Sequence, residues 1–146
     1  MIGKDVLSNP HLLVKSKPIL KDYYAGIIRI NEKDPTSEIY QNTVNKCFTL
    51  VQKYDGDINQ FLCGIILVLW GVPIHFPTDK EKSLKFFEEL KKSGLLISAI
   101  LFNDTGLYGS FGNETRFTVT TISDNMFNVI KEIINCDNGV YINKMV

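Results

Sequence analysis

The sequence predicts an α+β domain in which helices pack over a mostly antiparallel sheet. The chain has 146 residues, enough for a single domain with one sizeable core. Runs of β-branched and aromatic residues alternate along it with segments whose apolar residues recur at helical spacing. Two of the strand-like runs are separated only by Cys63-Gly64, which indicates a β-hairpin and therefore antiparallel pairing.

The domain is predicted to occupy residues 23–146. Residues 1–22 contain Pro10, Pro18 and alternating lysines, so we expect an N-terminal arm there, or a linker from a larger polypeptide. The first strand is predicted at Tyr23–Ile30, where aromatic and β-branched residues surround an Ala-Gly pair.

A helix and the hairpin follow this strand. Thr36 or Ser37 can cap the helix. Its apolar face is formed by Tyr40, Val44, Cys47, Phe48 and Val51. The hairpin pairs residues 58–62 with residues 65–70, and the second of these strands is apolar throughout. That composition predicts a strand that is covered on both faces.

The next segments are predicted as a helix and two short strands. Thr78-Asp79-Lys80-Glu81 has the pattern of a capping box, and the helix that it starts should stop at Gly94. Strands are expected at residues 95–101 and 107–111, with a turn at residues 103–106 between them.

The last part is predicted as strand, helix and strand. The strands lie at residues 116–120 and 140–142, and the helix between them starts near Ser123. One side of this helix is formed by Met126, Phe127, Ile130, Ile133 and Ile134.

Composition argues against several functional classes. Sixteen basic and sixteen acidic side chains cancel, whereas a general nucleic-acid binder normally has a basic excess. The most apolar run, residues 61–74, is shorter than the roughly 20 residues that span a bilayer, so we expect no membrane insertion. The three cysteines lack metal-ligand spacing, which suits reduced, mostly buried thiols in the cytoplasm and no zinc site.

Three sequence blocks carry further information. The first runs from Tyr54-Asp55-Gly56-Asp57-Ile58 through Gln60-Phe61 to Leu69-Trp70-Gly71-Val72-Pro73. The second is Ile100-Leu101-Phe102-Asn103-Asp104-Thr105-Gly106, followed by Gly109-Ser110-Phe111-Gly112. The third is Arg116-Phe117-Thr118-Val119 and continues to Asp124.

In this order the blocks resemble motifs of class III adenylate and guanylate cyclase domains. The family motifs are Gly-Gly, Lys-Phe and Phe-Gly-x-Pro for the first block, Ile-x-x-His-x-Gly and Gly-x-x-Gly for the second, and Arg-x-Tyr-Thr-Val-Ile-Gly-Asp for the third. The resemblance extends from about Tyr23 to Ile142. It implies a ferredoxin-like, cyclase-type sandwich that pairs with another cyclase-homology domain, as a homodimer or a heterodimer.

The resemblance also implies which residues catalysis requires, and this chain lacks most of them. In the family, two aspartates hold two magnesium ions that activate the ribose hydroxyl and bind the triphosphate. Those positions correspond to Arg29 and Gly64, so no metal residue is expected. The lysine that reads the purine edge corresponds to Gln60.

The third block aligns with the family in two ways. Without a gap, Asn125 matches the catalytic asparagine and Val129 replaces the arginine. With two residues inserted, Asp124 matches the family aspartate, Phe127 replaces the asparagine and Lys131 replaces the arginine. The nucleotide-binding candidates are then Gln60, Thr118 and Asp124, and the vestigial catalytic candidates are Asn125 and Lys131.

These replacements favour a catalytically silent cyclase-like domain, a pseudocyclase, that acts by dimerisation or by regulating a partner. The alternative is a cyclase subunit that completes a partner's active site for cyclic AMP or cyclic GMP synthesis. Mg²⁺ and ATP or GTP would be needed only in that pairing, and no cofactor is expected otherwise. Two further hypotheses are a nucleotide or small-ligand sensor without turnover, and an α+β interaction domain unrelated to cyclases.

Overall fold

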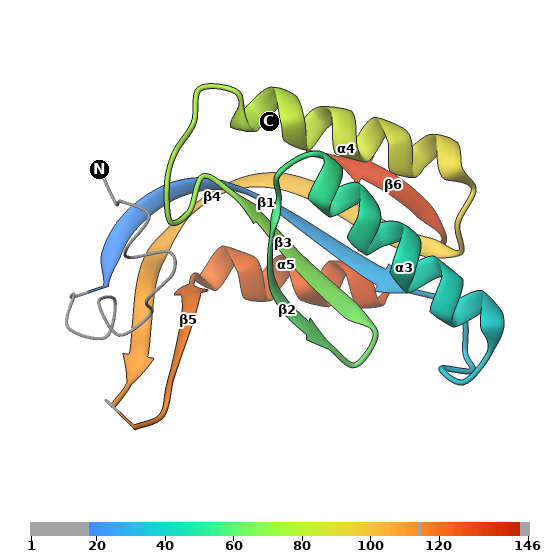
Figure 1. Cartoon of the computed structure of the whole chain (residues 1–146), viewed down its shortest axis with the longest axis horizontal. Coiled ribbons are helices and arrows are strands. Elements are labelled where there is room, and N and C mark those ends of the chain that lie inside the picture. Colours follow the sequence, from blue (N-terminus) through green and yellow to red (C-terminus); the bar gives the residue numbers. More distant parts are fainter. Residues whose placement is uncertain (1–17, 114, 144–146) are drawn as a thin grey trace.

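The computed structural model describes residues 18–113 and 115–143 and has one sheet with helices on both faces (Figure 1). The elements in chain order are β1 Ile19–Ile30, α3 Glu38–Lys53, β2 Asp57–Leu62, β3 Ile65–Trp70, α4 Asp79–Ser93, β4 Ile97–Gly112, β5 Phe117–Ile122, α5 Asp124–Ile134 and β6 Gly139–Ile142. None of the helices in these residues combines the length and the apolarity needed to cross a membrane.

The sheet is mostly antiparallel, as predicted. Its strands lie in the order β2-β3-β1-β4-β5, and neighbours along this path pair antiparallel. β6 pairs with β4 in parallel, beside the half of β4 that β5 leaves free. The order of the elements therefore agrees with the α+β architecture predicted from the sequence.

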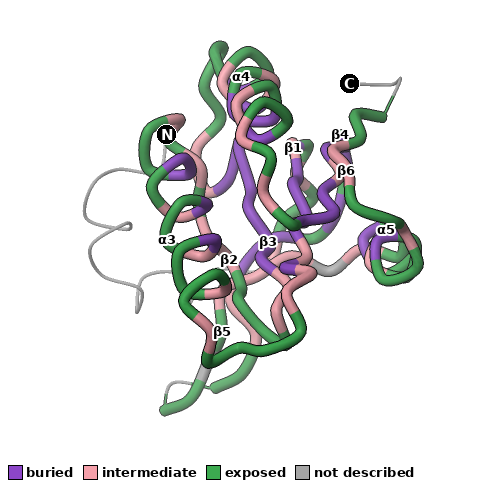
Figure 2. The backbone as a smooth tube through the Cα atoms, turned by 90° about the vertical axis from the view of Figure 1, so that its right-hand side faces the viewer, coloured by how far each residue is buried: buried purple, intermediate pink, exposed green. Residues whose placement is uncertain are grey.

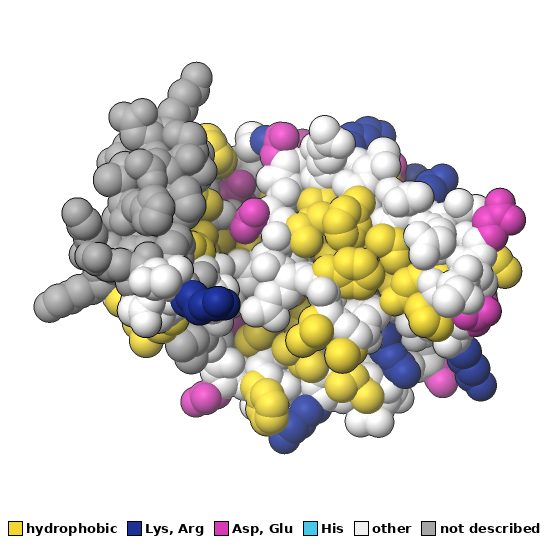
Figure 3. Space-filling view, turned by 60° about the horizontal axis from the view of Figure 1, so that its bottom comes forward, with side chains coloured by type: hydrophobic (Ala, Val, Ile, Leu, Met, Phe, Trp, Pro, Cys, Tyr) yellow, Lys and Arg dark blue, Asp and Glu magenta, His cyan; other side chains and the backbone are white. Residues whose placement is uncertain are grey.

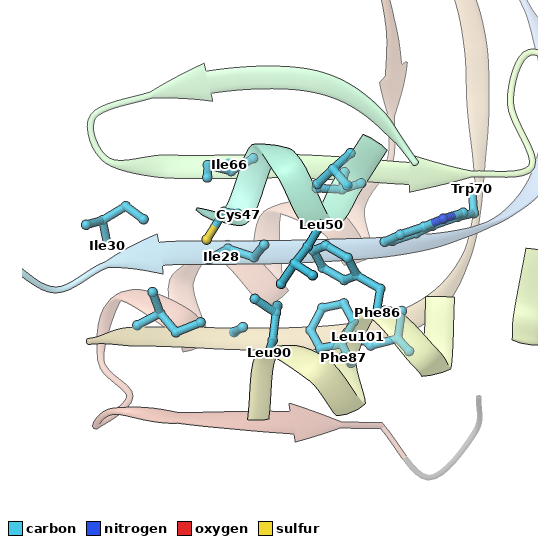
Figure 4. Close-up of a cluster of buried hydrophobic side chains, with 14 residues drawn as sticks. Ile28, Ile30, Cys47, Leu50, Ile66, Trp70, Phe86, Phe87, Leu90 and Leu101 are labelled. Atoms are coloured by element: carbon cyan, nitrogen blue, oxygen red, sulfur yellow. The ribbon is translucent and has the colours of Figure 1, made fainter. Parts of the chain in front are cut away.

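Two apolar clusters pack on opposite faces of the sheet. α3 and α4 cover one face and α5 covers the other, which we call the α5 face (Figure 2). Figure 4 shows the cluster beneath α3 and α4, where the ring of Trp70 of β3 lies near the ring of Phe86. β3 contributes to both clusters, and Ile66 to Trp70 are all buried, as its uninterrupted apolar sequence predicts.

The first strand begins earlier than predicted. β1 starts at Ile19 rather than at Tyr23, so residues 19–22 of the predicted arm belong to the sheet. Residues 1–17 of that arm lie outside the described residues.

The predicted turn at residues 103–106 is also wrong, because these residues pair with β1. β4 is one strand of 16 residues, and its residues 104–108 pair with the early part of β1. Asn103 donates a side-chain hydrogen bond to the Tyr23 carbonyl (3.0 Å), which ties an apparent turn residue to the neighbouring strand. Long-range pairing between β1 and β4 thus overrides the local turn preference of Asn-Asp-Thr-Gly.

The helix starts follow the predictions, except for one cap. Ser37 caps α3 by accepting from the Tyr40 N–H, and Ser123 caps α5 by accepting from the Met126 N–H. α4 begins where predicted, but Thr78 makes no cap bond. Asp79, which is buried, accepts from the Phe76 N–H (2.7 Å) instead.

Two predictions about burial are wrong. On α5, Met126, Val129 and Ile133 face the core, whereas Phe127 and Ile134 of the predicted apolar side are exposed. Of the three free cysteines only Cys47 is buried, while Cys136 is half-buried and Cys63 is exposed.

Candidate functional site

The two positions that correspond to the family's metal aspartates lie side by side. Arg29 pairs with Ile65 across the β1–β3 ladder, and the Ile30 N–H donates to the Gly64 carbonyl at 2.8 Å. The end of β1 and the turn of the β2–β3 hairpin therefore meet. The residues at this meeting point are a cation and a glycine.

The hairpin turn has a backbone that suits its two residues. Cys63 and Gly64 both have positive φ, 53° and 74°, as a two-residue turn with strand-compatible twist requires. A Cβ added at Gly64 would lie 3.3 Å from the Tyr40 hydroxyl oxygen. A larger side chain at position 64 would therefore crowd Tyr40 as well as adopt an uncommon φ.

Arg29 has a structural partner at this site. Its Nη1 donates to the Ile134 carbonyl at the C-terminal end of α5, at 2.6 Å. The last carbonyls of a helix lack intrahelical donors and carry partial negative charge, so a guanidinium is well suited to them. Arg29 thus joins β1 to the end of α5.

A polar network next to Arg29 fixes the segment that follows α5. The Asn31 amide donates to the Ser98 hydroxyl (2.8 Å) and to Asn138 Oδ1 (2.5 Å). The Ser98 hydroxyl donates in turn to the Asp137 carbonyl at 2.9 Å. β1, β4 and the α5–β6 connection are therefore locked together at the end of the sheet where the alignment places the metal site.

The side chains at this end do not fit a pair of magnesium ions. Mg²⁺ prefers carboxylate oxygens, and Arg29 and Gly64 supply none. Within residues 18–113 and 115–143, no three His, Cys, Asp or Glu side chains are grouped closely enough to hold a metal ion.

The positions predicted to read the base lie on β2 and β5, the two ends of the sheet path. Gln60 and Thr118 are both exposed. Among the described residues, no hydrogen bond joins these two side chains. Asn59, the neighbour of Gln60, instead bonds directly to β5: its Nδ2 donates to the Val119 carbonyl at 3.2 Å, and its Oδ1 accepts from the Thr120 hydroxyl at 2.8 Å. The strands that would flank a base are tied to each other.

Asn125, the vestigial catalytic candidate, belongs to a polar cluster inside its own chain. Its Nδ2 donates to Asp104 Oδ1 at 3.3 Å, while Asp104 Oδ2 accepts from the Tyr23 hydroxyl at 2.9 Å. The Tyr23 hydroxyl also lies 2.7 Å from Thr121 Oγ1. Burial raises the Tyr23 pKa well above its ordinary value, and the Asp104 charge raises it further, so the phenol stays neutral.

The two remaining candidates are exposed on α5. Asp124 lies in the first turn, where a carboxylate interacts favourably with the helix N-terminus. Lys131 Nζ lies 4.4 Å from the centroid of the Phe127 ring, one helical turn earlier. The structure does not bring Gln60, Thr118, Asp124, Asn125 and Lys131 into one hydrogen-bonded cluster.

Asp57 at the start of β2 has an altered ionisation. Although the residue is exposed overall, surrounding protein partly desolvates its carboxyl and raises its pKa above the ordinary value of 3.8. Its charge acts on Tyr108 of β4, whose pKa is raised to about 12, mainly by burial.

This raised pKa predicts how Asp57→Asn changes stability with pH. The folded chain binds the Asp57 proton more tightly than the unfolded chain, so the ionised carboxylate opposes folding once the pH exceeds the folded pKa. We expect Asp57→Asn to have a higher melting temperature than the unmodified chain at pH 7. The difference should vanish near about pH 3, where both states are protonated. Melting temperatures that differ equally at both pH values would contradict this prediction.

Apolar side chains remain uncovered on the α5 face. Leu62 lies opposite Ile65 in the hairpin and is 69% exposed, and Phe127 and Ile134 on α5 are 60% and 46% exposed. Figure 3 shows the side of the molecule that lies at the bottom of Figure 1, where hydrophobic side chains gather over the middle and charged residues lie mostly toward the margins. Single exposed apolar residues are common, but a gathered group of this kind is typical of an interaction surface.

Two shallow cavities of about 520 Å³ lie elsewhere. One is between the end of α4 and β6, and the other is between α3 and β2. Neither is lined by any of the predicted nucleotide-binding or catalytic residues.

Sequence reasoning missed the residues that organise this region. Asn59, Tyr23 and Asp104 each connect strands that are far apart in the chain, and no local pattern marks them. Only Asn31 could have been suspected from the sequence, because a polar residue directly after an apolar strand often forms a hydrogen bond at the strand end.

Comparison with known proteins shows what the fold resembles. No protein-family model matches the chain, and no curated protein sequence matches it. Among solved structures, the guanylyl cyclase Cya2 has a TM-score of 0.68 at 13% identity, over 87% of this chain and 77% of that one. The adenylyl cyclase CyaB from P. aeruginosa has a TM-score of 0.66 at 16% identity, over 88% and 80%.

A third solved structure is the non-canonical dimeric guanylyl cyclase domain of the RhoGC fusion protein from the aquatic fungus Blastocladiella emersonii. Its TM-score is 0.62 at 12% identity, over 88% of this chain and 82% of that one. At these identities the likeness establishes the fold: the chain has the fold of adenylyl and guanylyl cyclase domains.

Proposed function

We propose that this chain is a catalytically silent, nucleotidyl cyclase-like domain that acts by pairing with another cyclase-homology domain. The observation that carries the proposal is Arg29, which stands where the family has a metal aspartate and bonds to the Ile134 carbonyl. Because Gly64 stands at the second metal position, neither position offers a carboxylate. Loss of one ligand could be offset by a neighbour, but both are absent and the first has a structural use.

Pairing is supported by the uncovered apolar residues of the α5 face and by the dimeric domain among the solved structures of this fold. Leu62 and Phe127 are large, exposed and placed on two elements of the same face. Burying such side chains against a partner removes apolar surface from water, which favours association. The three free cysteines suit a reducing compartment, so we place the domain in the cytoplasm.

An assay for cyclic nucleotide production tests whether the chain is catalytically inactive. The purified chain is incubated with ATP or GTP and Mg²⁺ or Mn²⁺, alone and with a cyclase-homology domain that has both metal aspartates. We expect no cyclic nucleotide from the isolated chain. Product from the chain alone would overturn the proposal, and product that appears only with the partner would support the alternative, a subunit that completes the partner's site.

Sedimentation tests pairing. We expect Leu62→Asp and Phe127→Asp to weaken association with a second copy or with the partner domain by at least about tenfold, because each places a charge in a buried apolar contact. Ile39→Asp on α3 is the matched control, since Ile39 is 56% exposed on the opposite side of the sheet. Equal weakening by all three substitutions, or by none, would contradict pairing through the α5 face.

A further inference from the structure

A β-bulge in β2 directs one side chain across to the far end of the sheet. Ile58 pairs with Val68 and Gln60 pairs with Leu67, so Asn59 has no partner in β3. An extra residue of this kind re-aims its side chain relative to the regular ladder. The Asn59 carboxamide reaches β5, where it uses its donor on the Val119 carbonyl and its acceptor on the Thr120 hydroxyl.

This contact joins two strands that are not neighbours in the sheet. β2 and β5 are the first and last strands of the path β2-β3-β1-β4-β5, so the sheet must curl for Asn59 to reach β5. The nitrogen and the oxygen of the Asn59 carboxamide each have a hydrogen-bond partner, and the two partners are consecutive residues of β5. A single side chain therefore ties together the two ends of the curled sheet.

The segment held by Asn59 covers part of the apolar cluster on the α5 face. Val119 is half-buried and packs against the cluster that contains Leu67, Leu69 and Tyr108. α5 itself packs mainly on β1 and β4. The β3 residues of the cluster must therefore be covered by another element. The partial desolvation of the nearby Asp57 carboxyl is consistent with a covered site beside the contact.

We propose that residues 109–112 of β4 and residues 117–120 of β5, which lie beyond the β1–β4 ladder, form a flap that Asn59 holds over the β3 side of the α5 face, and that loss of the Asn59 contact opens this flap. The hinge lies where Thr121 bonds to Tyr23, because that contact anchors the end of β5 next to α5. Opening the flap uncovers apolar residues of β3 without unfolding the α3–α4 layer. The proposal concerns the chain by itself and does not depend on pairing.

Thiol trapping can report opening of the flap and of the whole domain in one sample. Val119→Cys places a thiol on the inner side of the flap, in a background with Cys63→Asn and Cys136→Ser. The remaining native thiol, Cys47, is fully buried beneath α3 and reports global unfolding. Rates of reaction with Ellman's reagent then give the opening equilibria of both regions.

We expect Asn59→Ala to speed the reaction at position 119 by about tenfold, since two modest hydrogen bonds are lost. Thr120→Val removes only one of them and should speed it by a few-fold. Because both substitutions act on one contact, the double variant should react no faster than Asn59→Ala alone. The Cys47 rate should stay constant throughout. Asn42→Ala, at an exposed asparagine of α3, is the control and should change neither rate.

Three results would overturn the flap. The first is a rate at position 119 that Asn59→Ala leaves unchanged. The second is a parallel rise in the Cys47 rate, which would mean that the whole domain opens. The third is a double variant whose effect is the product of the single effects, which would mean that Asn59 and Thr120 do not act through one contact.

Discussion

Arg29→Asp should lower the free energy of unfolding by about 2 kcal/mol and should not create a magnesium site. The substitution removes the guanidinium that bonds to the Ile134 carbonyl and places a carboxylate at the negative end of α5. It also restores the residue type that the family has at this position. Urea denaturation monitored by circular dichroism gives the first result, and the melting temperature with and without Mg²⁺ gives the second.

Lys33→Asp is the matched control for Arg29→Asp. Lys33 is an exposed residue that follows the same strand, so its reversal changes the net charge equally without removing a contact to α5. We expect it to change the free energy of unfolding by less than about 0.5 kcal/mol. A clear rise in melting temperature of the Arg29→Asp variant with Mg²⁺ would contradict the assignment of this position to a structural role.

Trp70→Ala should cost about 4 kcal/mol, the largest loss that we expect from a single substitution in the hairpin. Trp70 is 1% exposed, and its ring centroid lies 5.3 Å from that of Phe86 in α4. Its Nε1 donates to the Tyr54 carbonyl at 2.9 Å. The free energy of unfolding from urea denaturation tests this value, which is a large part of the total for a domain of this size.

Trp70→Phe separates the two contributions of the indole. It keeps an aromatic ring against Phe86 but loses the bond to Tyr54, so it should cost roughly half as much as Trp70→Ala. A loss below about 1 kcal/mol for Trp70→Ala would mean that the hairpin is not anchored through this ring. The conclusion that this segment serves mainly as core would then be wrong.

These two residues lie at positions that align with cyclase motifs, and each makes a contact that serves the fold. Trp70 lies in the block that resembles the family's Phe-Gly-x-Pro motif, and it is buried against α4. Arg29 aligns with a metal position of the cyclase motifs and bonds to the carbonyl at the end of α5. In this chain both motif positions contribute to holding layers together, which is a requirement of the fold and needs no substrate.

The sequence by itself determined the class of the fold and most of its elements. The turn at Cys63-Gly64, the caps at Ser37 and Ser123 and the apolar run of β3 are local signals, and each predicted its element correctly. The alignment of Arg29 and Gly64 with the metal positions was also available from the sequence. In the structure the Ile30 N–H donates to the Gly64 carbonyl, so positions 29 and 64 lie close together at the end of the sheet.

Only the tertiary structure decided what the polar residues bind. β4 runs through its apparent turn because β1 extends to Ile19 and pairs with it, and no local pattern contains that partner. Arg29 and Ile134 are separated by 105 positions in the chain, and Asn59 and Thr120 by 61. Hydrogen-bond partners at such separations are set by how the sheet curls and how α5 packs on it. Local periodicity and capping signals do not encode those features, because they act over a few residues.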